Sequence, residues 1–256
     1  MLANKTALIT GSTSGIGLGI AKALARQGAN IVLNGFGDAE GPKAEIAALG
    51  AKVAYHGADM SKPAEIEAMM AFAAATFGQV DILVNNAGIQ HVARVEDFPV
   101  DRWDAIIAIN LTSAFHASRL AIPAMRAANW GRIINVASVH GLVASADKSA
   151  YVAAKHGIVG LTKVTALENA TTGVTCNAIC PGWVLTPLVQ KQVDAKAVAM
   201  GLSNEEAKKQ LLQEKEPSMQ FTTPEELGEL AVFFCSAAGN NVRGVAWNMD
   251  GGWTAQ

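Results

Sequence analysis

Charged residues are sparse in this chain, and several sequence features are missing altogether. Only 16% of its 256 residues are charged, the formal net charge is −2, and no basic cluster occurs. We therefore expect no nucleic-acid partner. No uncharged apolar run is long enough to cross a bilayer, and no charged and apolar leader precedes the first apolar run, so neither a membrane span nor a signal peptide is expected.

Cysteine is also scarce, and Cys176, Cys180 and Cys235 form no CxxC pair. Cys176 and Cys180 lie in an expected strand, where four residues span about 13 Å. That separation is too large for a disulfide bond. We interpret the thiols as reduced core residues of a cytoplasmic protein, and we assign no residue to a metal site.

Short apolar runs alternate with helical patterns along the chain. Strands are expected at residues 6–10, 30–34, 52–55, 81–85, 132–137, 174–180 and 244–249. Helices are expected at residues 16–27, 39–49, 63–77, 99–127, 150–170 and 224–235. This alternation predicts an α/β fold with parallel strands and right-handed crossovers. Because no linker or repeat interrupts it, we assign residues 1–256 to a single domain.

Residues 188–220 break this rhythm. They are polar and rich in Lys, Glu and Gln, and they lie between Pro187 and Pro217. A polar insertion of this length is usually a lid or a disordered loop. Its sparse apolar positions favour one or two amphipathic helices packed weakly on the domain, so we expect a mobile lid.

Three glycines, Gly11, Gly15 and Gly17, directly follow the first expected strand. Glycines at a strand-to-helix turn let the backbone approach a phosphate, and the helix N-terminus then supplies N–H donors. The bare G-x-x-x-G-x-G pattern is weak, because chance glycine turns also match it. Its position between a strand and a helix favours a dinucleotide site.

The second expected strand ends without the carboxylate that often binds the ribose of NAD. The chain runs Asn-Gly-Phe-Gly-Asp from residue 34 to residue 38. An NADP 2′-phosphate would pair with Arg or Lys, and neither occurs at 12–14 or 34–37. We therefore predict NAD, from the absence of a phosphate partner. Phe36 either packs on the adenosine or covers the core in a turn.

Tyr151 and Lys155 are four residues apart, which on a helix places both side chains on one face. An ammonium beside a phenol favours the phenolate, so we expect the pKa of Tyr151 to fall from about 10 toward working pH. Such a tyrosine can give or take a proton, and Ser138, ending an apolar run, can hold a substrate oxygen. Taken alone, these residues are more often a surface pair and a strand-end serine.

Two further candidates follow the third and fourth expected strands. Asp59 and Asn86 lie at the carboxyl edge where doubly wound sheets bind ligands. Asp59 is equally consistent with a helix cap, and Asn85–Asn86 with a turn.

Several motifs, taken together and in order, resemble the short-chain dehydrogenase/reductases over essentially the whole chain. They are Thr10-Gly11-x-x-x-Gly15-x-Gly17, Asn85-Asn86-Ala87-Gly88, Asn110, Ser138, Tyr151-x-x-x-Lys155 and Pro181-Gly182. The stretches 34–37, 87–91, 138–145, 148–151 and 250–253 are more similar still to bacterial D-3-hydroxybutyrate dehydrogenases. The resemblance implies a doubly wound Rossmann-type fold with a seven-stranded parallel sheet, helices on both faces and a homotetramer. It also implies reversible oxidation of (R)-3-hydroxybutyrate to acetoacetate with NAD.

The resemblance also implies residue roles. Tyr151 is the acid/base, Ser138 binds the reacting oxygen, Lys155 holds the nicotinamide ribose, and Asn110 organises a water that relays protons. The implied cofactor residues are Gly11, Thr13, Ser14, Gly15, Ile16, Gly17, Phe36, Asp59, Met60, Asn86, Ala87, Gly88, Tyr151, Lys155, Pro181, Gly182, Val184 and Thr186. Leu185 departs from the arginine expected in the most similar relatives, which puts in doubt any charge at that edge of the site.

A 3-hydroxybutyrate site must also hold a carboxylate two carbons from the reacting carbon. Donors are therefore needed near Ser138 and Tyr151. The candidates for this clamp are Gln90, His140, Lys148 and Gln192, each of which is otherwise an ordinary loop or surface residue. Trp183 and Trp253 are expected to form apolar walls, or else core or subunit contacts.

Two other functions compete with this hypothesis. The first is a reductase for another short oxo acid or a neutral ketone, which would not need Lys148 and His140. The second is a non-catalytic dinucleotide-binding protein, which could keep the three glycines and lose Tyr151 or Lys155; both residues are present.

Overall fold

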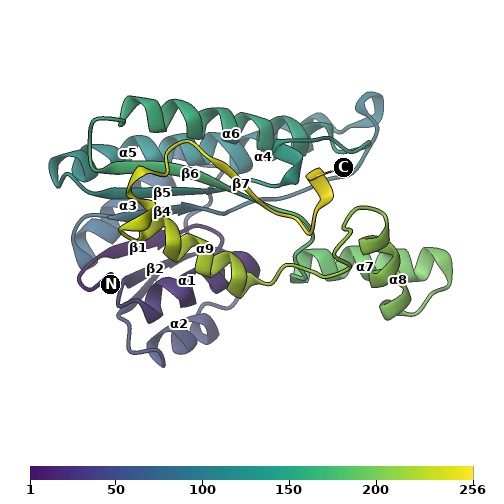
Figure 1. Cartoon of the computed structure of the whole chain (residues 1–256), viewed down its shortest axis with the longest axis horizontal. Helices are drawn as coiled ribbons and strands as arrows, with labels where there is room; N and C mark the ends of the chain where they lie inside the picture. Colours follow the sequence, from purple (N-terminus) through teal and green to yellow (C-terminus); the bar gives the residue numbers. More distant parts are fainter. Residues whose placement is uncertain (256) are drawn as a thin grey trace.

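A seven-stranded parallel sheet forms the centre of the computed structural model, which describes residues 1–255 (Figure 1). The strand order is β3-β2-β1-β4-β5-β6-β7. The strands are β1 Thr6–Ile9, β2 Asn30–Asn34, β3 Val53–His56, β4 Ile82–Asn85, β5 Gly131–Val136, β6 Val174–Pro181 and β7 Ala246–Met249. The doubly wound α/β fold and its seven parallel strands are therefore confirmed.

Helices cover both faces of the sheet, because alternate residues of each buried strand point to opposite sides. In β1, Ala7 and Ile9 join one apolar cluster while Leu8 joins the other. The first face packs against α1 Gly15–Arg26, α2 Glu40–Ala47 and α9 Pro224–Cys235. The second packs against α3 Pro63–Phe77, α5 Ser113–Ala127 and α6 Ser149–Glu168, and Figure 1 shows the two layers above and below the strands.

The helix expected over residues 99–127 is not one regular α-helix. It consists of α4 Val100–Ile107, a π-helical turn at Ala108–Thr112 that contains Asn110, and α5. Such turns occur frequently at functional sites. By length and composition alone, the stretch Val100–Ala127 could cross a membrane, although it contains charged residues such as Arg119. In the structure, α5 packs on α3 and the sheet.

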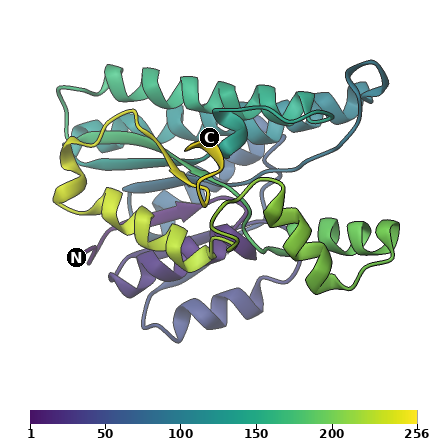
Figure 2. The same cartoon turned by 45° about the vertical axis from the view of Figure 1, so that its right-hand side comes forward.

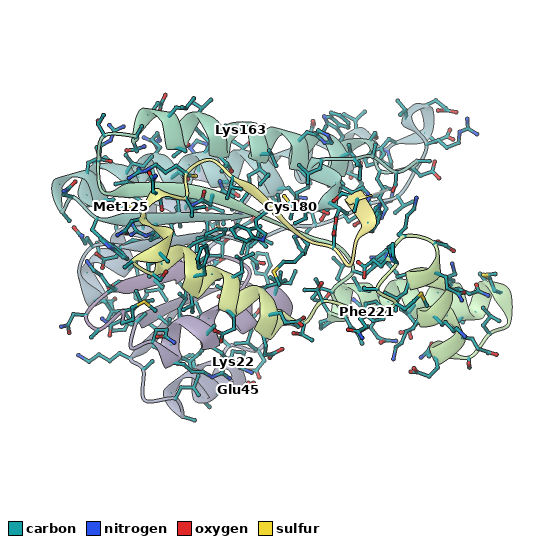
Figure 3. The ribbon with its side chains drawn as sticks, viewed as in Figure 1. Lys22, Glu45, Met125, Lys163, Cys180 and Phe221 are labelled. Atoms are coloured by element: carbon teal, nitrogen blue, oxygen red, sulfur yellow. The ribbon has the colours of Figure 1, made fainter. Side chains whose placement is uncertain are left out.

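The segment expected to contain one or two helices has two, α7 Pro187–Met200 and α8 Asn204–Gln213, so the alternative of a disordered loop is wrong. Figures 1 and 2 show these helices projecting past the carboxyl ends of the strands, away from both helical layers. Their small apolar cluster comprises Val189, Val193, Ala197 and Ala207. Trp183 and Phe221 pack against this cluster, and Figure 3 labels Phe221 at its inner end.

The cysteines behave as expected from the sequence. All three are free and buried, and Figure 3 shows Cys180 inside the sheet layer. Burial raises the pKa of Cys176 and Cys235 to about 12 and that of Cys180 to about 11. The thiols are therefore protonated core residues rather than nucleophiles.

Short 3₁₀ turns complete the described chain. They lie at Val95–Asp97, Val139–Gly141, Ala238–Asn241 and Trp253–Ala255. Two of them matter for function, because Val139–Gly141 directly follows Ser138 and Trp253–Ala255 closes one side of the cleft described next.

Candidate active site

The strand order reverses between β1 and β4, and the loops that leave these two strands diverge. A crevice forms at such a point, outside the carboxyl ends of the strands. Here it is a cavity of about 250 Å³. Residues from the loops after β1, β4, β5 and β6, from α6 and α7, and from the C-terminal 3₁₀ turn line it.

Most of the residues singled out from the sequence meet in this cavity. Of the catalytic and substrate residues, it brings together Gln90, Ser138, His140, Lys148, Tyr151, Lys155, Trp183, Gln192 and Trp253. Of the cofactor residues, it includes Gly11, Ser14, Gly15, Ile16, Asn86, Ala87, Gly88, Pro181, Gly182, Val184 and Thr186. The cavity is also lined by four residues that the sequence analysis did not name: Ile89, Pro187, Leu188 and Val189. They directly follow Gly88 and Thr186, so their position next to these residues could have indicated them.

Six expected residues lie outside the lining: Thr13, Gly17, Phe36, Asp59, Met60 and Asn110. Phe36 is 69% exposed and accepts a hydrogen bond from the Thr13 hydroxyl through its backbone carbonyl. Asp59 accepts hydrogen bonds from the backbone N–H and hydroxyl of Ser61, which lower its pKa and hold a turn before α3. Cofactor contacts at these positions stay predictions.

The loop after β1 is tied to the loop after β4. The Asn86 amide donates to the carbonyls of Thr10 at 2.9 Å and Gly11 at 2.8 Å, and the Thr10 hydroxyl accepts from the backbone N–H groups of Asn86 and Ala87. A Cβ at Gly17 would overlap the Gly11 carbonyl and come within 2.6 Å of the Asn86 amide nitrogen. The backbone of this turn therefore approaches β4 and the α1 N-terminus closely, which fits a bound pyrophosphate.

Helix α6 places Tyr151 and Lys155 on one face, as the spacing predicted. The Lys155 ammonium donates to the Val136 carbonyl at 2.7 Å and lies 5.6 Å from the centre of the Tyr151 ring. Burial lowers the pKa of Lys155 to about 8 and raises the pKa of Tyr151, with the Ser138 hydroxyl opposing the latter shift. The expected lowering of the Tyr151 pKa is therefore wrong for this arrangement, because burial outweighs the opposing hydrogen bond of Ser138.

Asn110 binds the loop after β4 rather than the cavity. Its side-chain oxygen accepts from the Ile89 N–H at 2.9 Å, and its amide donates to the Ile89 carbonyl at 2.9 Å. This reciprocal pair engages both the oxygen and the nitrogen of the amide and fixes the loop that contains Gln90. The π-helical turn aims Asn110 at this loop.

His140 is a neutral side chain held between two serines. Its Nδ1 lies 3.4 Å from the Ser138 hydroxyl and its Nε2 lies 2.9 Å from the Ser145 hydroxyl. Burial, with smaller contributions from Lys148 and Lys215, lowers the pKa of His140 to about 4. The ring is therefore uncharged at neutral pH. Its tautomer decides whether Nδ1 donates to the Ser138 hydroxyl or accepts from it.

Two tryptophans form one wall of the cavity. The Trp183 and Trp253 rings lie 6.0 Å apart, and the Lys148 ammonium lies 5.4 Å from the Trp183 ring centre. Trp253 meets His140 edge to face at 5.4 Å. Burial lowers the pKa of Lys148, with Lys215 adding to the effect.

Known proteins show the same organisation along the whole chain. The family model described as short chain dehydrogenase matches residues 5–220. A protein of Cupriavidus necator named D-beta-hydroxybutyrate dehydrogenase is 73% identical over 100% of both chains, and one of that name from Rhizobium meliloti is 56% identical over 98% of this chain and 99% of its own. The crystal structure of a single-substitution variant of actinorhodin polyketide ketoreductase with NADPH superimposes with a TM-score of 0.94 at 32% identity, covering 100% of both chains. With the glycine turn, the serine and the Tyr–Lys pair in one cleft, the chain belongs to the short chain dehydrogenase family of oxidoreductases.

Proposed function

We propose that this protein reversibly oxidises (R)-3-hydroxybutyrate to acetoacetate with NAD. The observation that carries the proposal is the Lys148 ammonium, which lines the same cavity as Ser138 and Tyr151 and forms no ion pair within residues 1–255. Lys148 is only partly buried, but a cation removed even in part from water is costly without a partner. A substrate carboxylate would supply that partner, and two relatives of high identity carry the name D-beta-hydroxybutyrate dehydrogenase.

The acid/base chemistry follows from three side chains. Ser138 donates a hydrogen bond to the reacting oxygen, and Tyr151 takes the hydroxyl proton during oxidation and returns it during reduction. NAD, when bound, accepts the hydride and brings a positive charge that favours the tyrosine phenolate. Because burial lowers the pKa of Lys155 to about 8, its ammonium can release a proton near neutral pH. A water held by Asn110 as the next proton acceptor stays a prediction.

The substrate carboxylate is proposed to bind at the other end of the cavity. Lys148 supplies the charge, and Gln90 and Gln192 supply neutral donors. His140 completes the clamp by exchanging its Ser145 contact for the carboxylate. Trp183 and Trp253 exclude water from the small apolar part of the substrate. A neutral ketone would leave the Lys148 charge unmatched, which disfavours the competing substrate class.

We further propose a cytoplasmic homotetramer. Large apolar side chains are exposed on two neighbouring helices: Phe115 of α5 is 47% exposed, and Val164 and Leu167 of α6 are 52% and 76% exposed. Large exposed apolar side chains of this kind favour contacts between subunits.

Replacing Tyr151 by Phe tests the reaction. The change keeps the ring and removes the transferable proton, so kcat should fall about 10²- to 10⁴-fold. The measurement is NAD reduction over a panel of 2-, 3- and 4-hydroxy acids and matched alcohols, with both enantiomers. Fluorescence titration with NAD serves as the control, because cofactor binding should survive. A variant within a few-fold of the wild-type kcat, or a wild type that prefers a neutral alcohol, would contradict the assignment.

The cofactor preference can be tested at Asp38. Its carboxylate accepts hydrogen bonds from the backbone of Glu40 and Gly41 at the start of α2, and residues 34–37 contain no cation to pair with a 2′-phosphate. We expect kcat/KM to favour NAD over NADP. Asp38→Arg should narrow this preference by about ten- to a hundredfold, the worth of one charge-assisted hydrogen bond. Asp38→Asn is the matched control, because it removes the negative charge without adding a positive one. Equal kcat/KM for NAD and NADP in the wild type would contradict the predicted preference for NAD.

Lys148→Met tests the carboxylate clamp. Loss of a charge-assisted hydrogen bond costs roughly 1.5–3 kcal/mol, so KM for 3-hydroxybutyrate should rise about ten- to more than a hundredfold with little change in NAD affinity. Lys163→Met is the matched control, because Lys163 is exposed on α6, the helix that Lys148 precedes, and points away from the sheet (Figure 3). If Lys148→Met still discriminates the acid from a neutral alcohol as the wild type does, Lys148 is not the anchor.

The α7–α8 segment is expected to move as a lid. Its apolar cluster is small, and Leu188, Val189 and Gln192 already line the cavity, so closure over a bound substrate would complete the site. Amides of residues 188–220 should exchange quickly in the free protein and become protected when NAD and an acetoacetate-like inhibitor are both bound. Hydrogen exchange with mass spectrometry measures this. Strong protection that is equal in both states would mean a fixed structural element.

A further inference from the structure

One acidic side chain of the α7–α8 segment is buried and points toward the active-site wall. Glu216 follows the end of α8 and is 1% exposed. Its neighbours Glu205 and Glu214 are exposed and pair with lysines. Glu216 forms no ion pair within the described residues, and its Oε2 atom is buried without a hydrogen-bond partner. Sequence reasoning missed this residue because the surrounding charges are typical of a solvated surface.

The carboxyl group of Glu216 holds the backbone of Trp183. Its Oε1 atom accepts a hydrogen bond from the Trp183 N–H, while the Trp183 carbonyl accepts from the Thr222 N–H at 3.0 Å. Trp183 is therefore fixed on both sides by residues that flank the end of the lid segment. A Cβ at Gly182 would overlap the Glu216 Oε1 atom, so the glycine of the Pro181–Gly182 motif makes room for this carboxyl group.

The fixed tryptophan in turn shapes the cavity. Its ring lies 6.0 Å from the Trp253 ring and 5.4 Å from the Lys148 ammonium. Displacing the Trp183 backbone would therefore move an apolar wall and the surroundings of the proposed carboxylate anchor together.

We propose that Glu216 is a positioning residue for substrate binding, which acts by anchoring Trp183 and joining the base of the α7–α8 segment to the substrate wall. The substrate part of this inference rests on the proposed function. The anchoring part rests only on the contacts of Glu216 with Trp183 and Gly182.

The anchor is sensitive to pH. Burial raises the pKa of Glu216 to about 7; the Trp183 N–H opposes this shift and Asp250 adds to it. The nearby cations do not pair with the carboxyl group, because Lys215 lies over the Trp253 ring and Lys148 over the Trp183 ring. A carboxyl group whose pKa is raised on folding binds its proton more tightly in the anchored arrangement than in the unfolded chain. The anchored arrangement is therefore most stable below the ordinary carboxyl pKa of about 4.5 and loses stability as pH rises to about 7.

Three variants test the proposal: Glu216→Ala, Glu216→Gln and the exposed control Glu214→Gln. Glu216→Ala should raise KM for 3-hydroxybutyrate at least tenfold, change kcat less, and leave NAD affinity within twofold. Glu216→Gln keeps the acceptor for Trp183, so it should restore KM to within about threefold of wild type. It should also flatten the part of the pH dependence of KM that Glu216 contributes between about pH 4.5 and pH 7. Glu214→Gln should match the wild type throughout.

Hydrogen exchange separates this inference from the proposed function. The peptide containing Trp183 should exchange at least tenfold faster in Glu216→Ala than in the control, whether or not 3-hydroxybutyrate is the substrate. Unchanged exchange in that peptide would overturn the anchoring role. Should Glu216→Ala fail to fold, a Glu216→Gln protein with the wild-type pH profile of KM would overturn the proposal by itself.

Discussion

The hydrogen bonds between Thr10, Gly11 and Asn86 are the interaction on which the rest of the site depends. The strand order reverses between β1 and β4, so the two loops that leave these strands diverge, and nothing in a parallel sheet holds them together beyond the last strand residues. The Asn86 amide and the Thr10 hydroxyl make four hydrogen bonds across this gap. The glycine turn is thereby fixed to the fourth strand, and the cavity opens at a defined place.

Burial sets the charge state of the cavity more strongly than any single pair of side chains. It lowers the pKa of Lys155 and His140 to about 8 and about 4, lowers that of Lys148, and raises that of Tyr151. All four shifts favour the neutral form, as desolvation requires. A bound nucleotide and an anionic substrate would restore charge where it is needed, so the acid/base state of the site is coupled to its occupancy.

The sequence predicted every strand to within two residues at each end, because the central runs are buried on both faces and bounded by turn residues. The cleft residues were predictable from the topology, because the carboxyl ends of parallel strands all lie at one edge of the sheet. Two predictions failed because they depend on tertiary packing. The π-helical turn contains Asn110, which pairs with Ile89 of a distant loop, and the pKa of Tyr151 depends on its burial.

Substrate choice in this fold is decided outside the sheet. The polyketide ketoreductase named above shares the architecture at a TM-score of 0.94 with only 32% identity, so the strands and covering helices place few limits on what is reduced. Here the substrate wall comes from the segment after β6, from α7, and from the C-terminal turn, which together contribute Trp183, Gln192 and Trp253. These pieces have a small apolar cluster of their own. Polar contacts add to the aromatic contact of Trp183 with Trp253 in placing them, and the buried carboxyl group of Glu216, between Trp183 and the end of α8, is such a contact.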